Sequence, residues 1–173
     1  MTPREPRLPN EMLPEVLKDH AAAAALYAAL PDAITGGHAE RNEPTLWIEP
    51  ARIVDVCRFL KDQQQFVRLS AITAVDWLPA DPRFEVVYLL HSLSRNQRLR
   101  LKCWIAEAQP EIDSVTGVWR TADWYEREVF DMFGVRFRNH PDLTRILMPS
   151  DWEGHPLRKD YPVHGYKYSY QDE

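Results

Sequence analysis

The sequence has few of the residues that redox and nucleotide sites require. It holds two cysteines, Cys57 and Cys103, which are far apart and form no CxxC pair. Each lies in an apolar pattern, which favours buried free thiols over a disulfide or cluster ligands. The chain therefore lacks the thiolates that an iron–sulfur cluster needs. None of the six glycines belongs to a GxGxxG or GK[ST] pattern, so no phosphate-binding loop is predicted.

Long hydrophobic runs and excess positive charge are also missing. The most apolar stretch, residues 21–30, is too short to cross a bilayer. It follows Glu15, Lys18, Asp19 and His20, and the acidic residues among them also argue against a signal peptide. The net charge of −5 argues against a nucleic-acid surface, which needs clustered Lys and Arg. We therefore expect a cytosolic protein that reaches a membrane only through partners.

What the chain has in excess is proline. Prolines make up 14 of 173 residues, about 8%, against a typical ~5%, and they concentrate at the two ends. Residues 1–10 are predicted to be a flexible N-terminal lead-in. Residues 138–173 contain prolines too often for a useful helix, yet they are too apolar for a linker. We interpret them as an extended C-terminal tail that binds another protein.

Between these ends, residues 11–137 are predicted to form one α+β domain. Helices are expected over 11–30, after Pro50, and over 122–133, where Gly134 ends the helix. The helix after Pro50 has one apolar stripe, and the residues of that stripe are Ile53, Val56, Cys57 and Leu60.

Five strands are expected between and after the first two helices. The two short ones cover 33–40 and 45–49. The longer ones are an alternating strand over 67–77, a strand over 84–91 that is apolar on both faces and so lies inside the sheet, and a third over 98–105. The third presents a basic row of Arg98, Arg100 and Lys102, which is either a docking patch for an acidic partner or, as we favour, a solvated face. The predicted fold class is α+β: a two-layer domain in which a mixed β-sheet carries helices on one face, followed by an extended proline-rich C-terminal tail.

The carboxylates of the helix over 122–133 are the obvious candidates for acid–base chemistry. Glu126 and Glu128 point about 200° apart on a helix, so they cannot share a proton as a catalytic pair does. Arg127 is four residues from both Asp123 and Asp131, a spacing that predicts ion pairs on the wet side. We therefore interpret this helix as an ion-paired structural element.

Histidines and acids of the C-terminal region are the one conceivable metal set: His140, His155, His164, Asp142, Glu153 and Asp160. Their spacing matches no compact ligand pattern and there is no HExxH. We favour histidines that bond to a carbonyl or carboxylate of a partner. Four tyrosines could stack on a quinone head group, but a protein interface uses tyrosine equally readily. These are Tyr161, Tyr166, Tyr168 and Tyr170.

The stretch EREVFDMFGVRFRNHPDLTRIL, followed by DWEGHPLRKDYP, resembles the signature of the 30 kDa subunit (the C subunit) of proton-pumping NADH:quinone oxidoreductase, respiratory complex I. The resemblance covers residues 15–167. Thr144 departs from it, because many relatives have a basic residue there. The matching residues, which we expect at partner interfaces, are Glu126, Arg127, Glu128, Asp131, His140, Arg145, Glu153, His155, Arg158, Lys159 and Asp160.

The resemblance implies a structural and assembly subunit of the peripheral arm, with no catalytic, cofactor-binding or metal-binding residue of its own. The whole complex would transfer electrons from NADH through FMN and iron–sulfur centres to quinone and pump protons. The implied partners are the 49 kDa quinone-site subunit and the neighbouring iron–sulfur subunit, on the cytoplasmic side of the bacterial inner membrane. Two alternatives remain: the equivalent subunit of a membrane-bound hydrogenase or other donor:quinone complex, and a small stand-alone enzyme using Glu153, His155 and Asp160.

The tail also carries a conformational expectation. Its apolar residues are too many to be buried on so small a domain, so residues 140–167 are expected to be mobile in the free chain and ordered in a complex. Charges at an interface core are costly unless partnered. The charged residues expected to pair with other chains are Glu153, His155, Arg158, Lys159 and Asp160.

Overall fold

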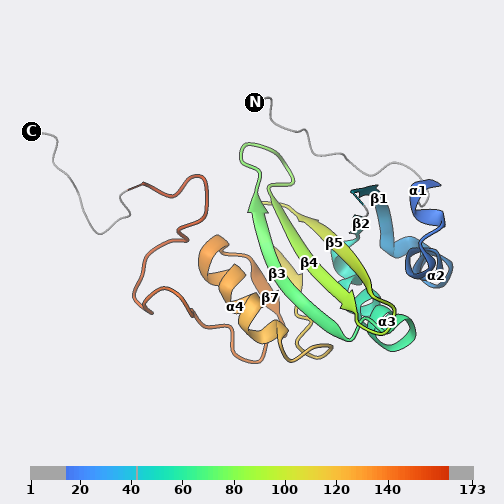
Figure 1. Cartoon of the computed structure of the whole chain (residues 1–173). Helices are drawn as coiled ribbons and strands as arrows, with labels where there is room; N and C mark the ends of the chain where they lie inside the picture. Colours follow the sequence, from blue (N-terminus) through green and yellow to red (C-terminus); the bar gives the residue numbers. More distant parts are fainter. Residues whose placement is uncertain (1–14, 42, 164–173) are drawn as a thin grey trace, which may run out of the picture.

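The computed structural model describes residues 15–41 and 43–163, in which a five-stranded sheet carries helices on one face (Figure 1). Short 3-10 turns, η1 (Pro31–Ala33) and η2 (Pro50–Arg52), precede β1 and α3. In chain order the other elements are α1 (Glu15–Lys18), α2 (Ala21–Ala29), β1 (Ile34–Glu40), β2 (Glu43–Ile48), α3 (Ile53–Gln64), β3 (Arg68–Asp76), β4 (Phe84–Ser92), β5 (Gln97–Ile105), β6 (Glu111–Asp113), α4 (Ala122–Phe133) and β7 (Arg136–Arg138).

The strand order in the large sheet is β1-β2-β5-β4-β3. Neighbours pair antiparallel except for β2 and β5, which are parallel. The predicted mixed sheet and the α+β class are therefore confirmed. The strand predicted over 84–91 corresponds to β4, which lies inside the sheet between β5 and β3, as its apolar faces indicate.

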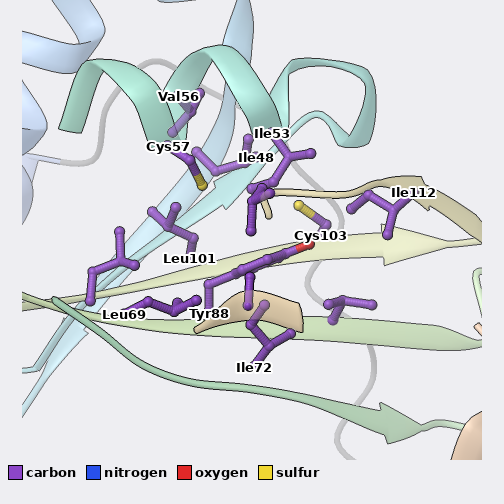
Figure 2. Packing of buried hydrophobic residues seen from close by; sticks show 14 of the residues in the cluster. Ile48, Ile53, Val56, Cys57, Leu69, Ile72, Tyr88, Leu101, Cys103 and Ile112 are labelled. Atoms are coloured by element: carbon purple, nitrogen blue, oxygen red, sulfur yellow. The ribbon is translucent and has the colours of Figure 1, made fainter. Parts of the chain in front are cut away.

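Rows of directly opposed side chains form the buried face of the sheet. Leu69, Leu90 and Leu99 make one row, and Ile72, Tyr88 and Leu101 make the next. Figure 2 shows α3 lying over this face, with side chains from its apolar stripe directed at the strands. All four residues of the predicted stripe are buried: Ile53, Val56, Cys57 and Leu60. Both cysteines are free and buried in this core, as predicted.

The predicted alternation along the strand over 67–77 is only half right. The register of β3 shifts between Leu69 and Ala71, which is a β-bulge. One extra residue exchanges the two faces of a strand. Beyond the bulge Ile72 and Ala74 are therefore the buried residues, whereas the sequence pattern suggests one continuous face from start to end.

The predicted single helix over 11–30 is wrong in its described part, because α1 and α2 are separate. The helix is interrupted at His20, whose backbone is extended and whose Nδ1 accepts a hydrogen bond from the Ala23 amide at 3.3 Å. The side chain thus caps α2, a role more usual for Ser or Asp. Residues 11–14 and the predicted lead-in 1–10 lie outside the described residues.

The short parallel pair of β6 and β7 was not predicted. Each has three residues, which are too few to show a hydrophobic alternation in the sequence. The pair fixes the chain on both sides of α4, since Ser114 N donates to Arg138 O at 2.9 Å. Beyond β7 the chain passes along α4 as the orange-to-red segment of Figure 1. The division into a domain (11–137) and a partner-binding tail (138–173) stays a prediction.

The helix over 122–133 and its end are as predicted. Gly134 caps α4 with a left-handed φ of 79°. A Cβ built at this position would lie 2.7 Å from Cδ2 of His155 in the tail, whereas a Cβ at Gly117 would meet nothing within 4 Å. Gly134 therefore serves both the helix end and the close approach of the tail.

Replacing Gly134 should consequently be costly. For Gly134→Ala we expect the free energy of unfolding to fall by at least about 1–2 kcal/mol, the usual cost of a left-handed residue with a Cβ, and the His155 ring to be displaced. Gly117→Ala is the matched control and should change the free energy of unfolding by less than about 0.5 kcal/mol. Urea unfolding of both variants checks this, and equal effects would contradict the close packing of His155 on Gly134.

Candidate partner-binding site

Asp131 on α4 is the residue to which the first part of the tail is fastened. Its side chain is completely buried, and Oδ2 accepts hydrogen bonds from the amides of Ile146, Leu147 and Met148 at 3.0, 2.8 and 2.9 Å. Oδ1 pairs with the guanidinium of Arg145. Burial alone would raise the pKa of Asp131, but these hydrogen bonds outweigh it and lower the pKa. The carboxylate is therefore charged and fully used by the tail.

The predicted ion pairs of Arg127 with Asp123 and Asp131 are wrong, because its guanidinium has other partners. Its guanidinium lies over the ring of Trp124, 5.3 Å from the centroid, and donates to the carbonyl oxygens of Thr144 and Arg145 at 3.1 and 3.3 Å. Asp131 faces inward and takes Arg145 as its partner. The i,i+4 spacing brings the groups near each other, but the tail offers Arg127 carbonyls that the helix pattern could not reveal.

His155 continues the attachment at the C-terminal end of α4. Its Nδ1 lies 2.9 Å from the backbone oxygen of Asp131. A carbonyl only accepts, so this nitrogen carries the proton. Its ring meets Phe130 edge-on, with the ring centroids 6.0 Å apart. Burial lowers the pKa of His155, and the backbone beside it is held as well, because Leu157 N donates to Met132 O at 3.0 Å.

A second anchor lies at the other end of the tail, around the buried Arg83. The guanidinium bonds both oxygens of Asp76, at 2.8 and 2.7 Å, and both oxygens of Asp160, at 3.0 and 2.8 Å. Glu107 is a third partner. The bonds to Asp76 and Asp160 raise the pKa of Arg83. One arginine thus ties β3, the start of β4, the chain after β5 and the tail together.

Asp76 is the buried half of this anchor. Burial works to raise its pKa, yet the hydrogen bonds from Arg83 and from the amides of Lys159 and Leu78 lower it to about 2. The Lys159 amide donates at 2.8 Å. Neither Asp76 nor Arg83 was identified from the sequence. Arg83 lies in a loop next to Pro82, and no periodicity or motif distinguishes it there.

Four of the five charged tail residues expected to pair with other chains already have polar partners within their own chain, and their pairing with other chains stays a prediction. His155 bonds α4, Lys159 bonds Asp76 through its amide, and Asp160 pairs with Arg83. Arg158 bonds both oxygens of Asp160, each at 3.0 Å. The domain supplies the Asp131 carbonyl, the Asp76 carboxylate and the Arg83 guanidinium as partners, and Asp160 within the tail supplies the partner of Arg158. Glu153 is exposed, and its carboxylate pairs with no described residue.

Glu126 and His140 form a separate buried pair at the start of α4. Glu126 Oε1 accepts from the Val115 amide at 2.7 Å, while Oε2 lies 3.9 Å from His140 Nε2 and has no hydrogen-bond partner among the described residues. Burial raises the pKa of Glu126 to about 7. Glu128 is exposed, so the prediction that Glu126 and Glu128 point apart is confirmed.

The residues considered for a metal or for catalysis are not brought together. His140 lies at the start of α4 and His155 at its end, while His164 lies outside the described residues, as do Tyr166, Tyr168 and Tyr170. Over residues 15–41 and 43–163 no group of three or more His, Cys, Asp or Glu side chains is arranged to hold a metal ion. Within the same ranges, every helix is too short or too polar to cross a bilayer.

Comparison with known proteins points to one family. The family model described as "Respiratory-chain NADH dehydrogenase, 30 Kd subunit" matches residues 46–167. The chain is 51% identical over 140 residues to the C subunit of NADH-quinone oxidoreductase from Roseiflexus sp. (strain RS-1), covering 80% of each chain. It is 52% identical over 126 residues to the C subunit from Geobacter sulfurreducens, covering 72% of this chain and 78% of the relative.

Solved structures have the same fold. A structure titled "Nqo5 of the trypsin-resistant fragment (1-134)" is 28% identical with a TM-score of 0.62, covering 69% of this chain and 97% of that one. A chain of the membrane-bound sulfane sulfur reductase, an archaeal respiratory membrane complex, is 24% identical with a TM-score of 0.72, covering 90% and 95%. At that identity the second similarity concerns the fold alone.

Asp131→Asn should release the first part of the tail. The variant leaves Arg145 without its charged partner and weakens the acceptor of three amides, so we expect a loss of roughly 3 kcal/mol in the free energy of unfolding. Trypsin should then cut at Arg145 faster than in the wild type. Asp151→Asn, an exposed residue of the same tail, should leave both quantities unchanged. Equal cutting rates in all three proteins would contradict the anchor.

Glu126→Gln should change the pH dependence of stability. The folded pKa of about 7 exceeds the ordinary ~4.3, so the folded state binds the proton more tightly. Stability is therefore full below about pH 4.5 and falls as the pH rises towards 7. Above pH 7 the variant should be more stable than the wild type by up to roughly 3 kcal/mol, and at pH 4 the two should match. Glu128→Gln is the exposed control; parallel stability curves for Glu126→Gln and wild type would contradict the buried acid.

Proposed function

Because the chain belongs to the family of the 30 kDa subunit of respiratory-chain NADH dehydrogenase, we propose that its tail is the surface on which neighbouring subunits dock. The chain is a subunit of the peripheral arm of NADH-quinone oxidoreductase, and its partners are other subunits of that complex. The equivalent subunit of a membrane-bound hydrogenase is not favoured, since relatives of about 50% identity are C subunits of NADH-quinone oxidoreductase.

The observation that carries this proposal is the orientation of the tail. Its amides and charged groups face the domain, where Asp131, Asp76 and Arg83 bind them. Leu143 and Met148 pack against the core, but three apolar side chains of the tail face outward: Leu147 is 61% exposed, Leu157 56% and Val163 97%. A segment whose amides are bound to its own domain while several large apolar side chains stay exposed is typical of a surface that another protein covers.

The anchoring also favours tight association. An extended segment that becomes ordered only on binding loses conformational entropy at that step. The described part of the tail has hydrogen bonds along its length, from Ile146 to Asp160. If these bonds hold it in place before assembly, binding requires less ordering, and the free energy from burying the leucines goes into affinity.

The finer assignments belong to the same proposal. The partners would be the 49 kDa quinone-site subunit and the iron–sulfur subunit, on the cytoplasmic side of the bacterial inner membrane. NADH, FMN, the iron–sulfur clusters and quinone would be bound by other subunits, and this chain would catalyse no step. In support, Cys57 and Cys103 are buried in the core, and burial raises the pKa of both thiols, which opposes the thiolate form that clusters require.

The double variant Leu147→Ser/Leu157→Ser tests the docking surface. Burying a leucine is worth about 1.5–3 kcal/mol, so losing two should weaken association by about 3–6 kcal/mol, on the order of 100-fold or more. Co-purification of tagged chain with the other subunits measures this, alongside the thermal midpoint of the free chain, which should not change. Leu93→Ser, 58% exposed just after β4, is the matched control. Normal recovery of the complex with the double variant would refute the proposal.

A further inference from the structure

The open face of the sheet carries a row of three basic residues. Arg68 on β3 stands directly opposite His91 on β4, and His91 stands opposite Arg98 on β5. Next to them Leu69, Leu90 and Leu99 form a row of the buried face. Because side chains alternate between faces along a strand, Arg68, His91 and Arg98 point to the side that α3 does not cover.

These three side chains have no acidic partner among the described residues, whether in hydrogen bonds or ion pairs. Their neighbours on the same face are neutralised: Arg100 pairs with Glu43, and Lys102 pairs with Glu85 at 2.9 Å. Arg68 and Arg98 lie on either side of His91, two strands apart, and no described acid offsets their charge.

Beside this row lies a depression of about 350 Å³. Its wall includes the three basic residues and the ion pair of Arg100 with Glu43. Pro44 and Leu89 give it an apolar part and Ser70 a hydroxyl. It occupies the opposite end of the strands from the tail anchor, since β3 runs from Arg68 to Asp76 and the anchor is built on Asp76. The groove is therefore a surface distinct from the tail.

We propose that this groove binds an acidic segment of a neighbouring protein subunit. Carboxylates of the segment would lie between Arg68 and Arg98, and one of its apolar side chains would cover Leu89. Charge complementarity selects the sign of the occupant. The apolar wall and the exposed arginines select a peptide over a small anion, which would need buried donors converging on one point. The proposal depends on the proposed assembly role in one respect only: the acidic segment is taken to belong to another subunit of the complex.

A glutamate-rich peptide with interspersed leucines, labelled with fluorescein, provides a test on the free full-length chain by fluorescence anisotropy. Arg68→Gln/Arg98→Gln should weaken binding at least tenfold and, because both side chains are exposed, should change the thermal midpoint by less than about 2 °C. Arg58→Gln, an exposed arginine of α3 without a described acidic partner, should change neither. No binding, or equal binding by all three proteins, would overturn the proposal. Competition by inorganic phosphate at the peptide's own affinity would also overturn it, in favour of a small-anion site.

A photo-crosslinking residue at Leu89 then identifies the occupant within the assembled complex. We expect mass spectrometry to find a crosslink to an acidic segment of another subunit, reduced at least tenfold by Arg68→Gln/Arg98→Gln. A complex that assembles and gives no such crosslink, or a crosslink to a segment without acids, would refute the groove but not the docking tail. The peptide assay needs no complex, so it decides the groove even if the docking proposal fails.

Discussion

The structure depends most on one buried carboxylate, that of Asp131. An ionised group can stay inside a protein only if hydrogen bonds and opposite charge replace its water. Three consecutive amides, 146–148, and Arg145 do this. Within the body of a helix or strand consecutive amides are used by its own hydrogen bonds, whereas residues 146–148 form no regular element and direct their amides at Asp131. The irregular, proline-rich path of the tail is therefore what allows Asp131 to be charged and buried.

Arg83 plays the corresponding part at the far end of the tail, as a buried cation surrounded by acceptors. It gathers Asp76, Glu107 and Asp160 around it. Hydrogen bonds hold the pKa of Asp76, Asp160 and Asp131 low, so both anchors are intact at neutral pH and weaken only as the pH falls below about 4. Between them the backbone of the tail faces inward, and its leucines face the solvent.

The sequence predicts what depends on local periodicity and misses what depends on return contacts. The span of α4, its end at Gly134, the stripe on α3 and the inner place of β4 all follow from spacing alone. The bulge in β3 does not, because one added residue leaves the pattern plausible on either face. Arg83 meets Asp160 across 77 positions, and nothing in the spacing relates them. Helix spacing places Asp131 on the wet side, where charged residues usually lie, whereas its burial depends on donors that lie 15–17 positions away.

Amide hydrogen exchange of the free chain tests the central claim, that the tail is fastened to its own domain before any partner binds. The amides of Ile146, Leu147 and Met148 report the anchor directly, since each donates to Asp131. The account predicts that they exchange much more slowly in the free wild-type chain than in Asp131→Asn. Fast exchange in the free wild-type chain, with protection gained only after assembly, would contradict it.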